Sequence, residues 1–215
     1  MILNIQQTKS NFHMEWIAQR TTGELFSKVE APFVTGKFEA FAAFSDATQL
    51  KLYYNPYDTS MGTALKDRLS FKVLQEGCFL GKILGKTKSV GFLKSYPYYE
   101  ITFDNEVYYV YEVGFGSKGL YLCVYKGDML IAIVDKALRV INYKDSYVAY
   151  LLNEQYAKIV TAFVVYYDVT AYGDLMQIAL LSVKERRVNT VQKDLIEKFD
   201  PNFIPRIKAM EGIVD

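Results

Sequence analysis

The segment at residues 154–172 constrains the fold of this chain more than any other part of the sequence. From Tyr156 onward it is almost entirely apolar, and only Lys158 and Thr161 interrupt the run before Asp168. A helix of this composition would be apolar on every face, so other parts of the chain would have to bury it on all sides.

A helix and a buried strand both remain compatible with this segment, because Val, Ile, Thr and Tyr also favour strands. Its length favours the helix, since strands usually contain about 3–10 residues. Asn153 suits the N-cap position, and Glu154 would interact favourably with the positive end of the helix dipole. We therefore expect a buried core helix over about 154–172, with a buried strand as the alternative.

The residues before this segment are patterned as short strands separated by turns. Tyr99, Ile101 and Phe103 alternate with polar residues, and Asp104-Asn105 then provides a turn signal. Further strands are expected at residues 38–44, 49–54, 69–74, 107–113, 120–125 and 129–134. Strands spaced this closely predict a sandwich or a barrel rather than alternating strands and helices.

The chain changes character again after the apolar segment. Residues 187–199 carry apolar side chains at helical spacing, and Asp200-Pro201 would end such a helix because the residue before proline disfavours the α region. The simplest division is one domain over residues 1–183 and a C-terminal helical appendage over residues 184–215.

The overall composition is that of a globular protein without a strong charge bias. A chain of 215 residues can bury a core without disulfides or metals, and its 18 Tyr and 14 Phe favour sheet. The formal net charge of +1 provides no general attraction to nucleic acid, which we do not expect as a partner.

The first residues lack the basic and apolar regions of a secretory signal, so we expect a cytoplasmic protein.

Neither a transmembrane segment nor a disulfide framework is expected. The longest uncharged apolar run, residues 159–167, is far shorter than the about 20 residues that a spanning helix needs. Cys78 and Cys123 lie in apolar or strand-like surroundings, which favours two buried thiols.

No motif indicates catalysis. Residues 114–119 match the G-x-G-x-x-G fingerprint, but a strand rather than a helix is expected after them. Residues 81–87 have three residues between their glycines, where a phosphate-binding loop has four. His13 is the only histidine, so histidine-dependent catalysis or zinc binding would have to use it. We expect no enzymatic activity, no cofactor and no metal.

A basic stretch lies between Gly77 and Tyr99, which encloses four lysines and no acidic residue. The lysines are Lys82, Lys86, Lys88 and Lys94. They are candidates for binding an anionic head group, where each lysine near an anionic surface contributes about 1 kcal/mol. The alternative is a solvated strand face whose lysines discourage pairing between sheet edges.

Three motifs resemble the superfamily that joins tubby C-terminal domains, LURP-one-related proteins and phospholipid scramblases. They lie at residues 129–136, 144–148 and 166–169. In that superfamily a strand of the form IA-x-I-x-K precedes a D-x-Y strand, and a hydrophobic helix follows. The resemblance implies an α+β, mostly β fold, in which a closed antiparallel β-barrel of about twelve strands surrounds a central hydrophobic helix. The C-terminal helical segment would be an addition to it.

Three functions follow as hypotheses. The first is a non-enzymatic structural or protein-interaction domain whose C-terminal arm, residues 184–215, docks a protein partner or a second copy of the chain. The alternative is a binding module for anionic lipid or a phosphorylated head group, because some tubby-like proteins bind phosphoinositides. An enzyme of unknown type is the third, since a fold does not fix a function.

Overall fold

The computed structural model describes residues 1–10, 13–32, 37–54, 70–90, 94–142, 144–171, 185–187, 191–192 and 195–213. Its strands are β1 (Ile2–Ser10), β2 (His13–Arg20), β3 (Leu25–Pro32), β4 (Phe38–Phe44), β5 (Gln49–Tyr54), β6 (Phe71–Gln75), β7 (Cys78–Val90), β8 (Lys94–Phe103), β9 (Glu106–Phe115), β10 (Leu120–Lys126), β11 (Met129–Lys136), β12 (Arg139–Ile141), β13 (Ser146–Leu151), β14 (Glu185–Arg187) and β15 (Val191–Gln192). Its helices are α1 (Ala157–Ala171) and α2 (Phe203–Met210), with 3-10 turns η2 (Gly116–Lys118), η3 (Glu154–Tyr156) and η4 (Ile196–Lys198).

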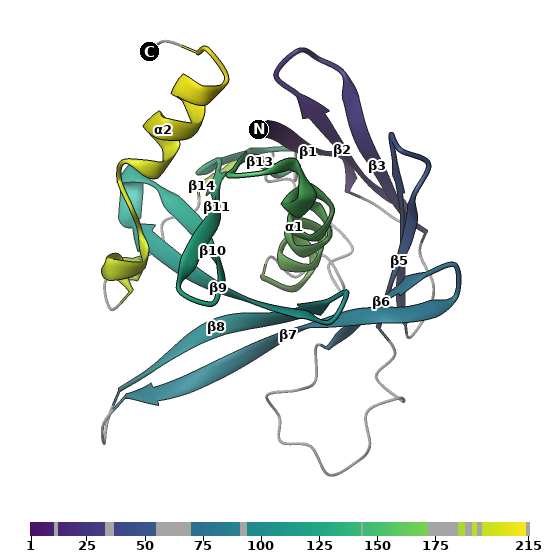
Figure 1. Ribbon diagram of the computed structural model, residues 1–215, viewed down its shortest axis with the longest axis horizontal. Helices are drawn as coiled ribbons and strands as arrows, with labels where there is room; N and C mark the ends of the chain where they lie inside the picture. The colour runs from purple at the N-terminus through teal and green to yellow at the C-terminus, as the bar shows by residue number, and fades with distance from the viewer. Residues whose placement is uncertain are drawn as a thin grey trace.

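Twelve antiparallel strands form a closed barrel, and α1 lies inside it (Figure 1). From β1 to β11 each strand pairs with the next one in the chain, and β13 closes the ring between β11 and β1. Closure gives every strand of the ring a neighbour on both sides, so no edge of the barrel is left unpaired. The expected barrel around a hydrophobic helix is therefore confirmed.

The apolar segment is a helix rather than a strand because the barrel covers it on all sides. Almost all of α1 is buried, including Phe163, Tyr166 and Tyr167. The ring of Tyr99, from the barrel wall, lies 5.3–5.9 Å from the rings of these three residues. Asn153 acts as the expected cap, since its Oδ1 accepts a hydrogen bond from the backbone N–H of Gln155 at 2.9 Å. No helix among the described residues is both long and apolar enough to cross a membrane.

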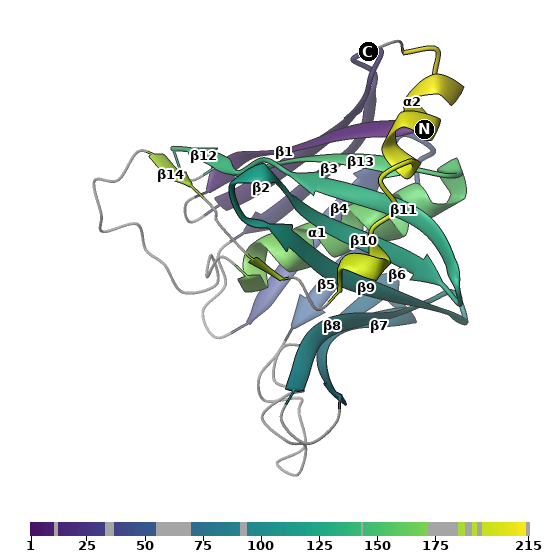
Figure 2. The ribbon, with the colours of Figure 1, turned by 90° about the vertical axis from the view of Figure 1, so that its left-hand side faces the viewer.

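The β7–β8 hairpin is longer than the barrel requires. β7 contains 13 residues and β8 contains 10, whereas the neighbouring β6 contains 5. The far end of the hairpin therefore projects away from the barrel, as Figure 1 and Figure 2 both show. At its other end β8 turns into β9 through Asp104 and Asn105, which both adopt the positive φ that such two-residue turns require.

A second hydrophobic cluster lies outside the barrel, where the C-terminal residues cover the wall (Figure 2). Leu195, Phe203 and Ile207 are buried there against side chains of four strands. These wall residues are Ile2 of β1, Val113 of β9, Cys123 of β10 and Ile133 of β11. The N-terminal amine of Met1 forms an ion pair with Glu211 at 3.1 Å. The C-terminal arm is thus held by both apolar packing and charge.

The expected C-terminal helical segment is present, but as α2 rather than over residues 187–199. The described residues of that range do not form an α-helix, because Arg187 ends β14, which pairs with β12 in a separate two-stranded sheet, and β15 pairs with β9 of the barrel. η4 follows, and the C-terminal helix α2 begins only after Asp200-Pro201. Asp200 contributes to this start, since its carboxylate accepts a hydrogen bond from the backbone N–H of Asn202 at 2.9 Å.

The two cysteines differ in their surroundings. Cys123 is buried as expected, and burial raises the pKa of its thiol to about 12. Cys78 is exposed, so the expectation that it is buried is wrong. It is the first residue of β7 and follows the turn at Glu76 and Gly77, where the strand has not yet entered the packed part of the wall.

Candidate functional site

The motifs that carry the family resemblance meet in one buried polar network near the carboxyl end of α1. Lys136 forms an ion pair with Asp145, and its Nζ lies 4.5 Å from the ring centre of Tyr147. The hydroxyl of Tyr147 donates a hydrogen bond to Asp168 Oδ1 at 2.5 Å. Trp16 Nε1 donates another to Asp168 Oδ2 at 2.8 Å. The network thereby joins β2, β11 and β13 to the helix.

This network is buried and links the barrel wall to the helix. Each of its five side chains is at most 2% exposed. Burial, together with the charge of Asp168, raises the pKa of Tyr147 well above its usual value, so its hydroxyl keeps the proton that it donates. Buried charges of this kind are tolerated because they are paired and hydrogen-bonded.

Replacement of Asp168 tests the network directly. Asp168→Ala would leave two buried donors without their acceptor, and we expect the free energy of unfolding to fall by about 3 kcal/mol or more. Asp168→Asn keeps one acceptor oxygen and should lose less. Urea denaturation followed by tryptophan fluorescence measures both, because Trp16 is itself a member of the network. Losses below about 1 kcal/mol in both variants would contradict this role.

A half-buried carboxyl lies on the outer face of the barrel. Asp135 follows Val134 in β11, and burial raises its pKa to about 6 from an ordinary value of 3.8. The folded chain therefore binds this proton more tightly than the unfolded chain does. The resulting contribution to stability is present at low pH and is lost as the pH rises from about 3.8 to about 6.

Asp135→Asn should remove this pH dependence. At pH 7.5 the variant should unfold with a free energy on the order of 1 kcal/mol higher than that of the unmodified chain. At pH 3.5 the two chains should be equally stable, because both carry a neutral side chain there. Chemical denaturation at the two pH values measures the difference. Equal stability at pH 7.5 would show that Asp135 is adequately solvated.

The strand register brings three of the four lysine candidates together on one outward face of the β7–β8 hairpin. Lys82, Lys86 and Lys88 occupy alternate positions of β7, so their side chains point to the same side of the strand. Lys82 and Lys88 are exposed, and Lys86 is half-buried. Lys94 lies opposite Val90 in the same register, and its side chain falls outside the described part of the structure.

The charges on this face are predominantly positive. Glu100 accepts a hydrogen bond from Lys86 Nζ at 2.6 Å, and this bond is the main reason why the pKa of Lys86 is raised. Lys72 of β6 lies directly opposite Lys82 and is also exposed. The two lysines therefore add positive charge to the same outward face.

Aromatic side chains lie among these lysines. Tyr98 lies opposite Lys86 and Tyr96 opposite Lys88. A further row crosses the outer face from Phe41 to Phe79, and these two residues are 48% and 62% exposed. Lys51 lies within this row, with its Nζ 5.4 Å from the ring centre of Phe41. We call the whole surface the lysine–aromatic wall. Its members are Phe41, Lys51, Lys72, Phe79, Lys82, Lys86, Lys88, Tyr96 and Tyr98.

Sequence reasoning found the lysines of β7 but missed the contributions of the other strands. Lys51, Lys72 and Phe41 join the wall only because β4, β5 and β6 pair side by side in chain order. Glu100 of β8 neutralises Lys86 and could have been found from the sequence. It alternates with the inward-facing residues of β8, which places its side chain on the outer face.

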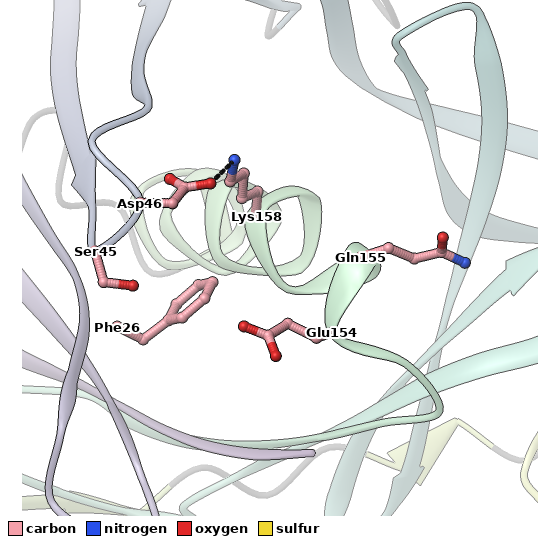
Figure 3. Close-up of a pocket in the computed structure, with 6 residues that line it drawn as sticks. All are labelled: Phe26, Ser45, Asp46, Glu154, Gln155 and Lys158. Atoms are coloured by element: carbon pink, nitrogen blue, oxygen red, sulfur yellow. Dashed lines mark hydrogen bonds and ion pairs between the residues drawn. The ribbon is translucent and has the colours of Figure 1, made fainter.

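A small hollow of about 220 Å³ lies elsewhere, at the end of the barrel where α1 begins (Figure 3). Its charged groups are already paired. Lys158 Nζ lies 2.5 Å from Asp46 Oδ2, and Arg20 lies 2.5 Å from Glu154 (Figure 3 shows the first pair). The hollow therefore presents less unbalanced charge to a ligand than the lysine–aromatic wall does. Its lining residues are Phe26, Ser45, Asp46, Glu154, Gln155 and Lys158.

Comparison with known proteins adds little to this geometry. No protein-family model matches the chain, and no curated protein matches it. Among solved structures, an X-ray structure of a protein from Arabidopsis thaliana superposes with a TM-score of 0.43 and 14% sequence identity. The match covers 78% of this chain and 91% of that one. Similarity at this level assigns neither a family nor a function.

Proposed function

We propose that this chain is a non-enzymatic binding domain that docks on an anionic membrane surface through the lysine–aromatic wall. The observation that carries the proposal is the register of β6, β7 and β8, which gathers lysines on one outward face with few acids among them. An outer wall formed by several strands can meet an extended charged surface without needing a pocket.

The aromatic residues of the wall support a lipid surface as the partner. Lysines near an anionic membrane each contribute about 1 kcal/mol of attraction to the head groups. Tyrosine favours the interface between lipid and water, which suits Tyr96 and Tyr98. Phe79, which is 62% exposed, could bury its ring among the acyl chains, at about 25 cal/mol for each Å² of apolar surface removed from water.

The C-terminal arm is the second candidate surface, and the packing of its described residues favours the wall over it. Leu195, Phe203 and Ile207 are the buried apolar side chains of the arm, and they pack against the chain's own barrel. A protein partner that needed these side chains would have to displace that packing first.

We also infer that the chain belongs to the superfamily that joins tubby C-terminal domains, LURP-one-related proteins and phospholipid scramblases. The support is the convergence of its three motifs. Lys136, Asp145, Tyr147 and Asp168 come from three separate motifs, and they meet in one network within a barrel that surrounds a hydrophobic helix.

Vesicle flotation tests the membrane proposal. The chain should float with vesicles of phosphatidylcholine and phosphatidylserine at low salt, but not with phosphatidylcholine alone. Lys82→Gln and Lys88→Gln should each weaken this binding about fivefold, because each removes about 1 kcal/mol of attraction. Raising the salt concentration should weaken it as well, since ions screen the exposed lysines.

Lys118→Gln is the matched control, since Lys118 is an exposed lysine of η2, outside the wall. It should leave flotation unchanged. Equal flotation with neutral and anionic vesicles would contradict the proposal. So would a Lys118→Gln variant that binds as weakly as the wall variants.

A further inference from the structure

The only histidine of the chain lies beside two glutamates on the outer face of β2 and β3. Glu15 and Glu30 are directly opposite each other in the register of these strands. His13 precedes Glu15 by two positions and therefore lies on the same face of β2. An imidazole nitrogen and one oxygen from each carboxylate all lie within 4.8 Å of one another. Such a convergence of nitrogen and oxygen donors is typical of a divalent metal site.

The cluster requires a cation because it places two carboxylates face to face. In this structure two lysines fulfil that requirement. Lys9 Nζ lies 2.9 Å from Glu15, and Lys28 Nζ lies 3.2 Å from Glu15 and 2.5 Å from Glu30. Thr8 also hydrogen-bonds Glu15, and Lys28 bridges the two carboxylates.

We propose that His13, Glu15 and Glu30 form a zinc site in which the metal replaces the ammonium group of Lys28. Zinc accepts imidazole nitrogen and carboxylate oxygen together, and three protein ligands leave a further position for water. Glu15 is buried and held by Thr8, whose hydroxyl donates to its Oε1 at 2.7 Å, so one ligand is already fixed in place.

The remaining movements are small and occur at the surface. Zinc ligands at about 2.0 Å from the metal lie about 3.3 Å from one another, which requires a modest contraction of the cluster. His13 is exposed and Glu30 is half-buried, so their side chains can rotate towards Glu15. Lys28 and Glu30 are each 43% exposed, and exposed ion pairs of this kind contribute little to stability, while Glu15 keeps its ion pair with Lys9. Its head group can therefore turn into solvent.

This site borders the lysine–aromatic wall at Phe41, which lies opposite Glu30 in the register of β3 and β4, but none of its three ligands belongs to the wall. It also departs from the sequence-based expectation of no metal. That expectation depended on spacing along the chain, whereas the cluster depends on cross-strand register. Because β2 and β3 both supply ligands, bound zinc would link the two strands and stabilise the folded chain through mass action.

Calorimetric titration with zinc tests the proposal on the full chain without a polyhistidine tag. A Cys78→Ser background removes an exposed thiol that could bind zinc by itself. One zinc should bind each chain, and His13→Ala or Glu30→Gln should weaken binding about tenfold or more. Lys28→Met should strengthen it, because this variant removes the competing ammonium group. A zinc-dependent rise in melting temperature should follow the same order.

The matched control is Glu197→Gln, which alters an exposed glutamate of η4 and should leave zinc binding unchanged. Two results would overturn the proposal. The first is the absence of zinc binding to the background chain. The second is binding that persists unchanged in His13→Ala, which would show that the cluster is an ion-pair network and that zinc binds elsewhere.

Discussion

A helix that is apolar on every face can exist in water only if the rest of the chain covers it completely, and the barrel follows from this requirement. The wall supplies a continuous apolar interior because alternate residues of each strand face inward. One charged group, Asp168, lies within the buried length of the helix, and it must find donors there. Trp16 and Tyr147 provide them, so the requirements of one helical residue fix parts of β2 and β13.

The sequence predicted where most helices and strands lie, but it did not predict which residues of neighbouring strands lie opposite each other. Periodicity identified α1 and most of the strands, because burial on one face or on all faces leaves a local pattern. It was wrong for the described residues of 187–199, where β15 pairs with β9 and η4 follows despite helical spacing. Single-strand patterns located the lysines of β7, but they could not reveal that Lys72 lies opposite Lys82 or Glu30 opposite Glu15. Such contacts depend on the register between strands, which one sequence does not display.

The filled interior also determines where binding can occur. Some barrels hold a small ligand at their centre, but here α1 and the inward side chains occupy that space. The charged groups Lys136 and Asp145, which are buried, are paired with each other. The surfaces that could meet other molecules are therefore on the outer wall, where lysines, aromatic rings and the His13 cluster are exposed or half-buried.

The position of β13 has a consequence for the order in which the chain can fold. β1 pairs with β13 through contacts such as that of Ile2 with Tyr150, so the first strand of the chain pairs with a strand that is made much later. A ribosome must therefore synthesise all of β1 to β11 before the ring can close, and contacts so distant in sequence form slowly. The apolar inner faces of the early strands stay accessible during that interval. The helix that fills them follows β13 after only the short turn η3.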